Sequence, residues 1–275
     1  DYARAETLSK ESLALYQQLG DDRGMGWNLE RLGTIARQRG DYPTAAKFYA
    51  ASGECLEKLA NQADMATLFL NLGELARQQD EPKKAETHYR KGLALAKALG
   101  SKRDEAALVD RLCVLDYQAG NYAKATARSE QSIALYHTLG DRFGLSEALY
   151  TRGRIAAAQQ QGESALPLYL ESLLLKARLG ERRGISDVFG ALAVVASREL
   201  PQRAVHLLAA ASGLRRTLAI NLPPSEQAAE EKLVDTLRVV LDDATFADAW
   251  ATGQQMPLDQ AIAYATEYIT EETEQ

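Results

Sequence analysis

The residue types that most often carry out chemistry in proteins are few and scattered in this sequence. Three histidines (His88, His137 and His206) and two cysteines (Cys55 and Cys113) are present, and none lies in an H-E-x-x-H or C-x-x-C pattern that would place two metal ligands together. A G-x-x-x-x-G-K-[ST] phosphate-binding loop is also missing from the sequence. We therefore expect no metal site and no cofactor.

The remaining reactive groups do not form a recognisable catalytic set either. Cys113 occupies a position that otherwise holds only small residues, which indicates a buried packing thiol rather than a nucleophile. The 38 aspartates and glutamates are typical of solvated helix faces, and no nucleophile can be matched with a base. We predict that this chain is not an enzyme.

What the sequence does contain is a repeat with a period of forty residues. Leucine returns at the same position of each period: Leu19, Leu59, Leu99, Leu139 and Leu179. The next position holds Gly20, Gly100, Gly140 and Gly180, with Ala60 as the exception. Two further positions hold only small residues, namely Gly33, Gly73, Cys113, Gly153 and Ala193, and Ala45, Ala85, Ala125 and Ala165. A fixed period of this length predicts stacked supersecondary units, each of which buries its apolar face against its neighbours.

Each repeat is predicted to form two helices. In the first complete repeat, apolar residues recur at helical spacing over Arg23–Arg39 and again over Tyr42–Leu59. Gly40 and Asp41 between them supply a helix stop and an N-cap, and Gly120-Asn121 does the same in a later repeat. The repeats run over residues 23–59, 63–99, 103–139, 143–179 and 183–219.

The small residues resemble the tetratricopeptide signature. Leu32-Gly33, Ala36, Ala45 and Tyr49 lie at its offsets, and the match returns at Leu72-Gly73, Ala76, Ala85 and Tyr89, and at Gly153, Ala156, Ala165 and Tyr169. The period exceeds the standard thirty-four residues by about six. The resemblance implies an all-α fold, a right-handed solenoid of antiparallel helix pairs.

The two ends of the chain depart from the repeat. Asp1–Leu19 resembles the second helix of a repeat whose first helix is missing, so we expect a fragment of a longer protein with an uncovered apolar stripe. The prolines of Asn221–Ser225 end the period. Three helices are predicted beyond it, at about 225–241, 244–252 with a stop at Gly253, and 257–269, followed by a frayed acidic end at 271–274. We thus predict repeats over residues 1–222 and a helical cap over 223–275.

The tail carries a second resemblance. Leu207–Arg215, Leu222–Glu226, Leu241–Phe246 with Ala249-Trp250, and Leu258–Ile262 are similar to the C-terminal ends of bacterial signal-transduction ATPases with numerous domains (STAND), including LuxR-type and SARP-type transcriptional regulators. In such proteins a tetratricopeptide array follows the switch domain. The resemblance implies a sensor or scaffold arm without chemistry of its own.

Charge and composition limit the kinds of partner that this chain is expected to bind. The formal net charge is −6, whereas a chain that grips nucleic acid usually presents a basic face. No apolar run approaches the roughly eighteen residues that span a bilayer, and the two cysteines lack a disulfide-framework spacing. We expect a cytoplasmic protein that binds neither nucleic acid nor membrane through this chain.

The resemblance also implies where a partner would bind. The first helix of each repeat lines the concave surface, and residue types at its outward positions change from repeat to repeat, as expected where packing does not dictate them. The alternative is a solvated helix face. The candidate partner-binding residues are Trp27, Glu30, Arg37, Leu70, Glu74, Arg77, Asp110, Tyr117, Glu147, Tyr150 and Arg154.

Two hypotheses about function remain open. In the first, the array is an interaction module that binds a protein, a peptide or another domain of its parent; because Glu30 and Asp110 stand where chaperone-binding arrays carry Lys and Asn, we expect an acidic peptide terminus to be repelled. In the second, it is a small-molecule sensor, which requires an enclosed and mostly apolar pocket.

Overall fold

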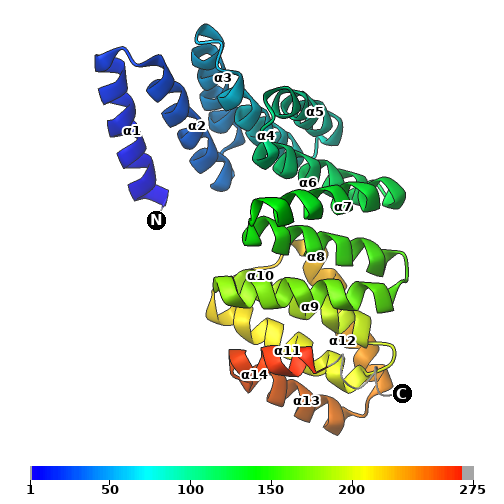
Figure 1. The fold of residues 1–275 in the computed structure, drawn as a ribbon. Coiled ribbons are helices and arrows are strands. Elements are labelled where there is room, and N and C mark those ends of the chain that lie inside the picture. The colour runs from blue at the N-terminus through cyan, green and yellow to red at the C-terminus, as the bar shows by residue number, and fades with distance from the viewer. Residues whose placement is uncertain (1, 268–275) are drawn as a thin grey trace. The chain divides into compact units, whose positions relative to one another are not determined.

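The computed structural model describes residues 2–267, and this segment of the chain is built from helices without any strand (Figure 1). The helices form two compact units, up to Leu139 and from Gly140. Unit 1 consists of α1 Tyr2–Leu19, α2 Asp22–Gln38, α3 Tyr42–Lys58, α4 Gln62–Gln78, α5 Pro82–Leu99, α6 Lys102–Gln118 and α7 Tyr122–Leu139. Unit 2 consists of α8 Arg142–Ala158, α9 Gly162–Leu179, α10 Arg182–Ala196, α11 Pro201–Thr217, α12 Pro224–Val240, α13 Asp243–Gln255 and α14 Leu258–Thr266.

Antiparallel pairs are the building block of both units, as predicted. The pairs are α2 with α3, α4 with α5, α6 with α7, α8 with α9, and α10 with α11. The first two predicted helices, Arg23–Arg39 and Tyr42–Leu59, agree with α2 and α3 to within one residue at each end. The all-α class and the tetratricopeptide arrangement of helix pairs are confirmed, whereas the predicted division of the chain at residue 222 stays a prediction.

The turns between helices repeat the same chemistry. A residue in the left-handed region ends one helix, and the next residue opens the following helix. Gly40 has φ +81°, and Asp41 Oδ1 then accepts a hydrogen bond of 3.1 Å from the Thr44 amide. Where the glycine is replaced, the backbone keeps its conformation, so that Ala60 is held at φ +49°. The forty-residue period is therefore fixed at the turns as well as in the core.

Within a pair, a tyrosine of the second helix lies against a glycine of the first. A Cβ added to Gly33 would come within 2.6 Å of the Tyr49 ring, and the same holds for Gly153 and Tyr169. The third pair lacks this contact, because Cys113 replaces the glycine; its buried thiol donates to the Ala125 carbonyl at 3.2 Å. Cys113 thus serves packing, as the sequence predicted.

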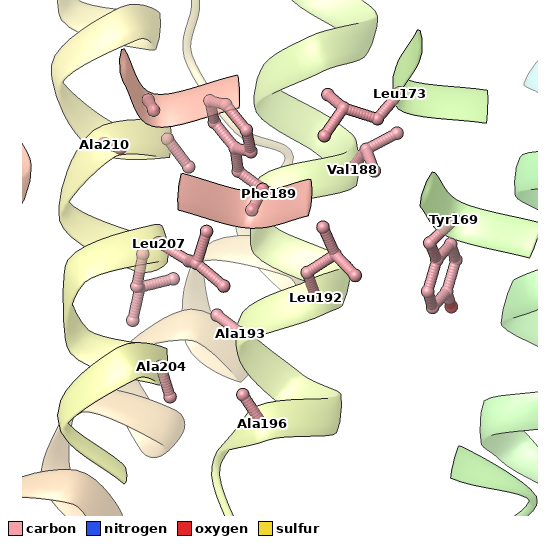
Figure 2. Close-up of a cluster of buried hydrophobic side chains, with 14 of the residues drawn as sticks. Tyr169, Leu173, Val188, Phe189, Leu192, Ala193, Ala196, Ala204, Leu207 and Ala210 are labelled. Carbon is pink, nitrogen blue, oxygen red and sulfur yellow. The ribbon is translucent and has the colours of Figure 1, made fainter. Parts of the chain in front are cut away.

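The last helices complete the core of unit 2. Phe189 and Leu192 of α10 lie in one buried cluster with Leu207 of α11 (Figure 2), and residues of α12, α13 and α14 join this cluster. The prediction that Gly253 stops a helix was wrong, because α13 continues to Gln255. Gly253 instead lets α13 approach α11: a Cβ there would collide with the carbonyl oxygen of His206. The predicted helix end at Ile269 and the acidic end at 271–274 lie outside the described residues.

The first helix has one covered face and one open face. Helix α1 packs on α2, and Ser9 is buried at the position that Tyr49 and Tyr89 occupy in later repeats. On another side of α1, Leu8 and Leu15 are more than half exposed. This is the uncovered apolar stripe that the sequence predicted.

Candidate functional site

The outward face of α2, α4 and α6, the first helices of the pairs in unit 1, is the candidate site; we call it the unit 1 face. It begins at Trp27 on α2, whose side chain is 56% exposed although tryptophan usually buries most of its surface. The guanidinium of Arg31, one turn further along α2, lies 5.7 Å from the centre of the Trp27 ring. Trp27 is therefore held as an exposed, flat apolar surface.

Glu30 lies behind Trp27 and is buried between helices. Asn71 of α4 donates a hydrogen bond of 2.8 Å to Glu30 Oε1, which ties α2 to α4. Burial and then the nearby carboxylate of Asp64 raise the pKa of Glu30 to about 7, against the smaller opposing effect of the Asn71 hydrogen bond. Near neutral pH, Glu30 is thus about half protonated.

Glu74 forms the centre of the polar network on α4. Its Oε1 accepts from the Tyr89 hydroxyl at 2.7 Å and pairs with Arg111 Nε of α6 at 3.2 Å, while its Oε2 pairs with Arg77 Nη2 at 3.0 Å. Burial opposes the ionisation of Glu74, but the charges of Arg111 and Arg77 outweigh it and lower the pKa of the carboxyl. Glu74 is a charged link that joins three helices.

The charged side chains of the unit 1 face lie at two depths, with carboxylates below and guanidinium groups above. The side chain of Asp110 is 6% exposed, whereas that of its neighbour Arg111, whose Nη1 lies 3.5 Å from Asp110 Oδ2, is 44% exposed. Glu30 and Asp110 were predicted as outward groups, and they are buried instead. The carboxylates lie underneath, and the guanidinium groups of Arg77 and Arg111 reach the surface.

The other predicted residues of unit 1 lie along the same helices. Arg37 Nε donates to the Tyr49 hydroxyl at 3.4 Å, so its side chain supports the α2–α3 pair. Leu70 packs against the buried cluster of α4, α5 and α6. The rings of Tyr117 and Tyr122 lie 6.1 Å apart at the end of α6.

The three predicted residues of unit 2 lie on the outward face of its first helices, which we call the unit 2 face (α8 and α10). Glu147 forms an ion pair with Lys176 of α9, a lysine whose side chain is only 2% exposed. The ring of Tyr150 lies near two cations, at 5.8 Å from Arg154 Cζ and 5.8 Å from Lys176 Nζ. Burial raises the pKa of Tyr150 well above its usual range, so its hydroxyl stays protonated.

Three residues that connect or flank the first helices of unit 1 were not predicted from the sequence. Arg31, Asn71 and Arg111 occupy one position of the forty-residue period, next to the position of Glu30 and Asp110. All three carry hydrogen-bond donors, and this common property was the available signal. The unit 1 face thus has donors at one position of the period, and at the preceding position it has the carboxylates Glu30 and Asp110.

The surroundings of the histidines bear on whether a metal site is possible. Among residues 2–267, no group of three or more histidine, cysteine or acidic side chains could hold a metal ion. His206 Nδ1 lies 3.1 Å from the Tyr264 hydroxyl and helps to hold α14, and His88 stacks on Phe69. Within the same residues, no helix has the length and apolar character needed to cross a membrane.

A family model supports the repeat assignment. Residues 64–138, which lie within unit 1, match the tetratricopeptide repeat model. No curated protein matches this sequence.

Solved structures of similar fold come from several functional classes. BtubC (BKLC) from P. vanneervenii is 15% identical with a TM-score of 0.67, over 81% of this chain and 94% of that one. A STAND protein with a tetratricopeptide repeat sensor, from Pyrococcus horikoshii, is 12% identical with a TM-score of 0.64, over 92% of this chain and 38% of that one. Aspartyl phosphate phosphatase F from Bacillus subtilis is 14% identical with a TM-score of 0.57, over 94% of this chain and 73% of that one.

These identities are too low to carry function across, and they establish the fold. The chain folds as a tetratricopeptide-repeat array. The array resembles the repeat region of a STAND protein, as the tail motifs implied. Such a fold supports a protein-interaction scaffold, because stacked helix pairs present a long and regular binding surface.

Proposed function

We propose that this chain is the interaction arm of a bacterial signal-transduction or transcriptional regulator of the STAND type, and that the unit 1 face binds a protein or peptide partner in the cytoplasm. The observation that carries the proposal is the exposed Trp27 of α2 with the Arg31 guanidinium against its ring. Arg77 of α4 and Arg111 of α6, both held by Glu74, add cations on the other first helices of the unit 1 face. The fold shared with a STAND repeat sensor supports it. In this proposal the arm carries no chemistry itself, and the helices beyond residue 222 cap the array.

The layered charges define the partner that fits best. Trp27 offers an apolar surface of the kind that anchors interface hot spots. Arg111 and Arg77 hold guanidinium groups in place through Glu74, which lowers the entropic cost of recruiting them to a carboxylate. A peptide with an apolar or aromatic anchor and acidic side chains matches both features.

A selection of short random peptides displayed on phage tests this proposal. Peptides enriched on the full chain should combine an aromatic or large apolar residue with Asp or Glu. Their affinity should fall at least tenfold for Trp27→Ala and for Arg111→Glu, and it should not change for Lys47→Glu on the exposed side of α3. Enriched peptides that bind Trp27→Ala and Arg111→Glu as tightly as the unaltered chain would refute the proposal.

Small-molecule sensing is the second candidate, and the cavity on which it is tested is lined by polar as well as apolar side chains rather than mostly by apolar ones. A cavity of about 300 Å³ lies between α1, α2 and α3, with Leu32 and Ile35 in its wall and the 2.6 Å ion pair of Glu6 with Arg39 beside it. A second cavity, of about 440 Å³, lies at the α8–α9 turn and is lined mainly by polar side chains, including Gln160 and Arg198. A compound that raises the melting temperature of the chain, but not that of Ile35→Trp, would support this second function.

A further inference from the structure

Helix α12 differs from the other helices of unit 2 in how little of it is buried. Of its seventeen residues, all described, Leu237 alone is buried, whereas α11 has ten buried residues. Glu230, Leu233, Val234 and Leu241 are half-buried and share the side of Leu237, and the remaining side chains of α12 are largely exposed. This stripe holds α12 in place, together with the Arg238 guanidinium, which lies 5.0 Å from the centre of the Phe246 ring of α13.

Part of what holds this side of α12 is an ion pair with an arginine of α11. Arg215, a buried arginine near the end of α11, donates through Nη2 to Glu230 Oε1 at 2.6 Å. Leu233 and Val234 pack against the same apolar cluster as Tyr150 of α8. Without α12, the Arg215 guanidinium would lose this charged partner.

Helix α12 packs on α11 and α13, and the charge of its first turn acts on a buried acid of α10. Asp187 of α10 has a raised pKa because it is buried and because Glu226 of α12 is close, although Arg183, Lys176 and Arg215 oppose the shift. Glu226 also raises the pKa of Tyr150 of α8, although burial and the charge of Asp187 raise it more. The acidic groups of α12 thus have cations of two helices in their surroundings, Arg215 of α11, which bonds to Glu230, and Arg183 of α10, which acts on the same Asp187 as Glu226.

The connections at both ends of α12 suit a helix that can lift away. Pro223 before it and Leu241 after it have extended backbones, with φ and ψ of −56° and 149°, and −103° and 146°. Helices α13 and α14 have their own anchors on α11, through Gly253 and through the hydrogen bond of Arg203 to the Tyr264 carbonyl. Because an isolated helix of this length is marginal in water, α12 depends on its seat. It should open at a lower free-energy cost than α11.

We propose that the side of α11 that carries Arg215, together with the apolar cluster beside it, is a binding surface for an amphipathic helix with an acidic first half and a leucine stripe, and that α12 occupies this surface in cis. A partner helix with a carboxylate at the place of Glu230 and leucines at the places of Leu233 and Leu237 would compete with α12. The tethered α12 has a high effective concentration, so it lowers the apparent affinity of any competitor until it is displaced. The residues of this surface all belong to unit 2, and the inference does not rest on the function proposed above.

The test uses the full chain and a fluorescein-labelled peptide of residues 223–241. Glu230→Arg in the chain sets two cations against each other and should release α12, while the surface around Arg215 stays unchanged. By fluorescence anisotropy, the peptide should then bind at least tenfold more tightly than it binds the unaltered chain. Glu231→Arg, a change at the exposed neighbouring position, is the matched control and should bind like the unaltered chain.

Hydrogen exchange and a rescue variant complete the test. In Glu230→Arg, amide exchange over 224–240 should accelerate at least tenfold while α9 stays protected, and Arg215→Glu combined with Glu230→Arg should restore protection and reduce peptide binding. Equal peptide binding by Glu230→Arg and Glu231→Arg would overturn the proposal. Acceleration that includes α9 would overturn it too, because α12 would then be an integral component of the core rather than an occupant.

Discussion

The ring of Tyr49 fills the space beside the Cα atom of Gly33, so a methyl group at Gly33 would lie 2.6 Å from Tyr49 Cε1. Because Tyr49 is fully buried and its hydroxyl shares a 3.1 Å hydrogen bond with Thr34, the ring cannot move aside freely. Gly33→Ala should therefore destabilise the chain by about 1 to 3 kcal/mol through overpacking. Urea denaturation followed by circular dichroism measures this change.

Gly190 of α10 is the matched control for that substitution. It also lies inside a first helix, but a Cβ added there meets no atom within 4 Å. Gly190→Ala should thus stabilise the chain by up to about 1 kcal/mol, since alanine is the better helix former. If both substitutions shifted stability in the same direction, the Gly33–Tyr49 contact would not be the cause.

Much of the fold follows from the forty-residue period alone. Small residues such as Gly33 and Ala45 mark where helices approach, and Gly40 with Asp41 marks a turn, so helix boundaries and pairing are both encoded locally. The prediction at Gly253 failed because a glycine that ends a helix and a glycine that permits a close approach look the same until the neighbouring helix is known.

The candidate site was less predictable for a related reason. Glu30 bonds to Asn71, and Glu74 pairs with Arg111, across separations of 41 and 37 residues. Whether side chains this far apart in sequence come into contact depends on how adjacent helix pairs are rotated against each other, and the period does not specify that rotation. The same uncertainty hid the burial of Asp110, since a residue near the edge of a helix face is covered or exposed according to that rotation.

Ala60 offers a test of the turn chemistry. Its φ of +49° is a conformation that costs a residue with a Cβ roughly 1 to 2 kcal/mol. Ala60→Gly should raise the free energy of unfolding by about 0.5 to 1 kcal/mol, because the relief is partly offset by the greater freedom of glycine in the unfolded chain. Ala46→Gly, at an exposed position inside α3, should lower it by about 1 kcal/mol. Urea denaturation of both variants measures the two changes, and a loss of stability in Ala60→Gly would contradict the turn geometry.

Because of Glu30, the free energy of unfolding should fall as the pH rises. Its pKa in the folded chain is about 7, above the usual 4.5, so the folded state binds the proton more tightly than the unfolded state. The associated stabilisation is complete below pH 4.5 and is lost as the pH rises through 7. Glu30→Gln removes the titrating group and keeps an oxygen for Asn71, so its advantage over the unaltered chain should grow between about pH 4.5 and 7 and level off above about pH 8, by roughly 3 kcal/mol in total.

Thermal melts at several pH values measure the Glu30 effect. The control is Glu54→Gln, which changes an exposed carboxylate on α3 and should leave the pH dependence as it is. A constant difference in melting temperature between Glu30→Gln and the unaltered chain, across that pH range, would show that Glu30 does not titrate in it.

His206 should loosen the last helix on acidification. Burial lowers the pKa of its imidazole below 6.5, although the Gln202 backbone and Asp248 oppose the shift, and its Nδ1 lies 3.1 Å from the Tyr264 hydroxyl. The contribution of neutral His206 is therefore present above pH 6.5 and is lost as the pH falls through the lowered pKa. Hydrogen exchange over 258–266, relative to α9, should thus increase between about pH 7.5 and 5. His206→Gln should abolish this increase and the exposed His137→Gln should retain it; an increase that survives in His206→Gln would assign the pH dependence to another group.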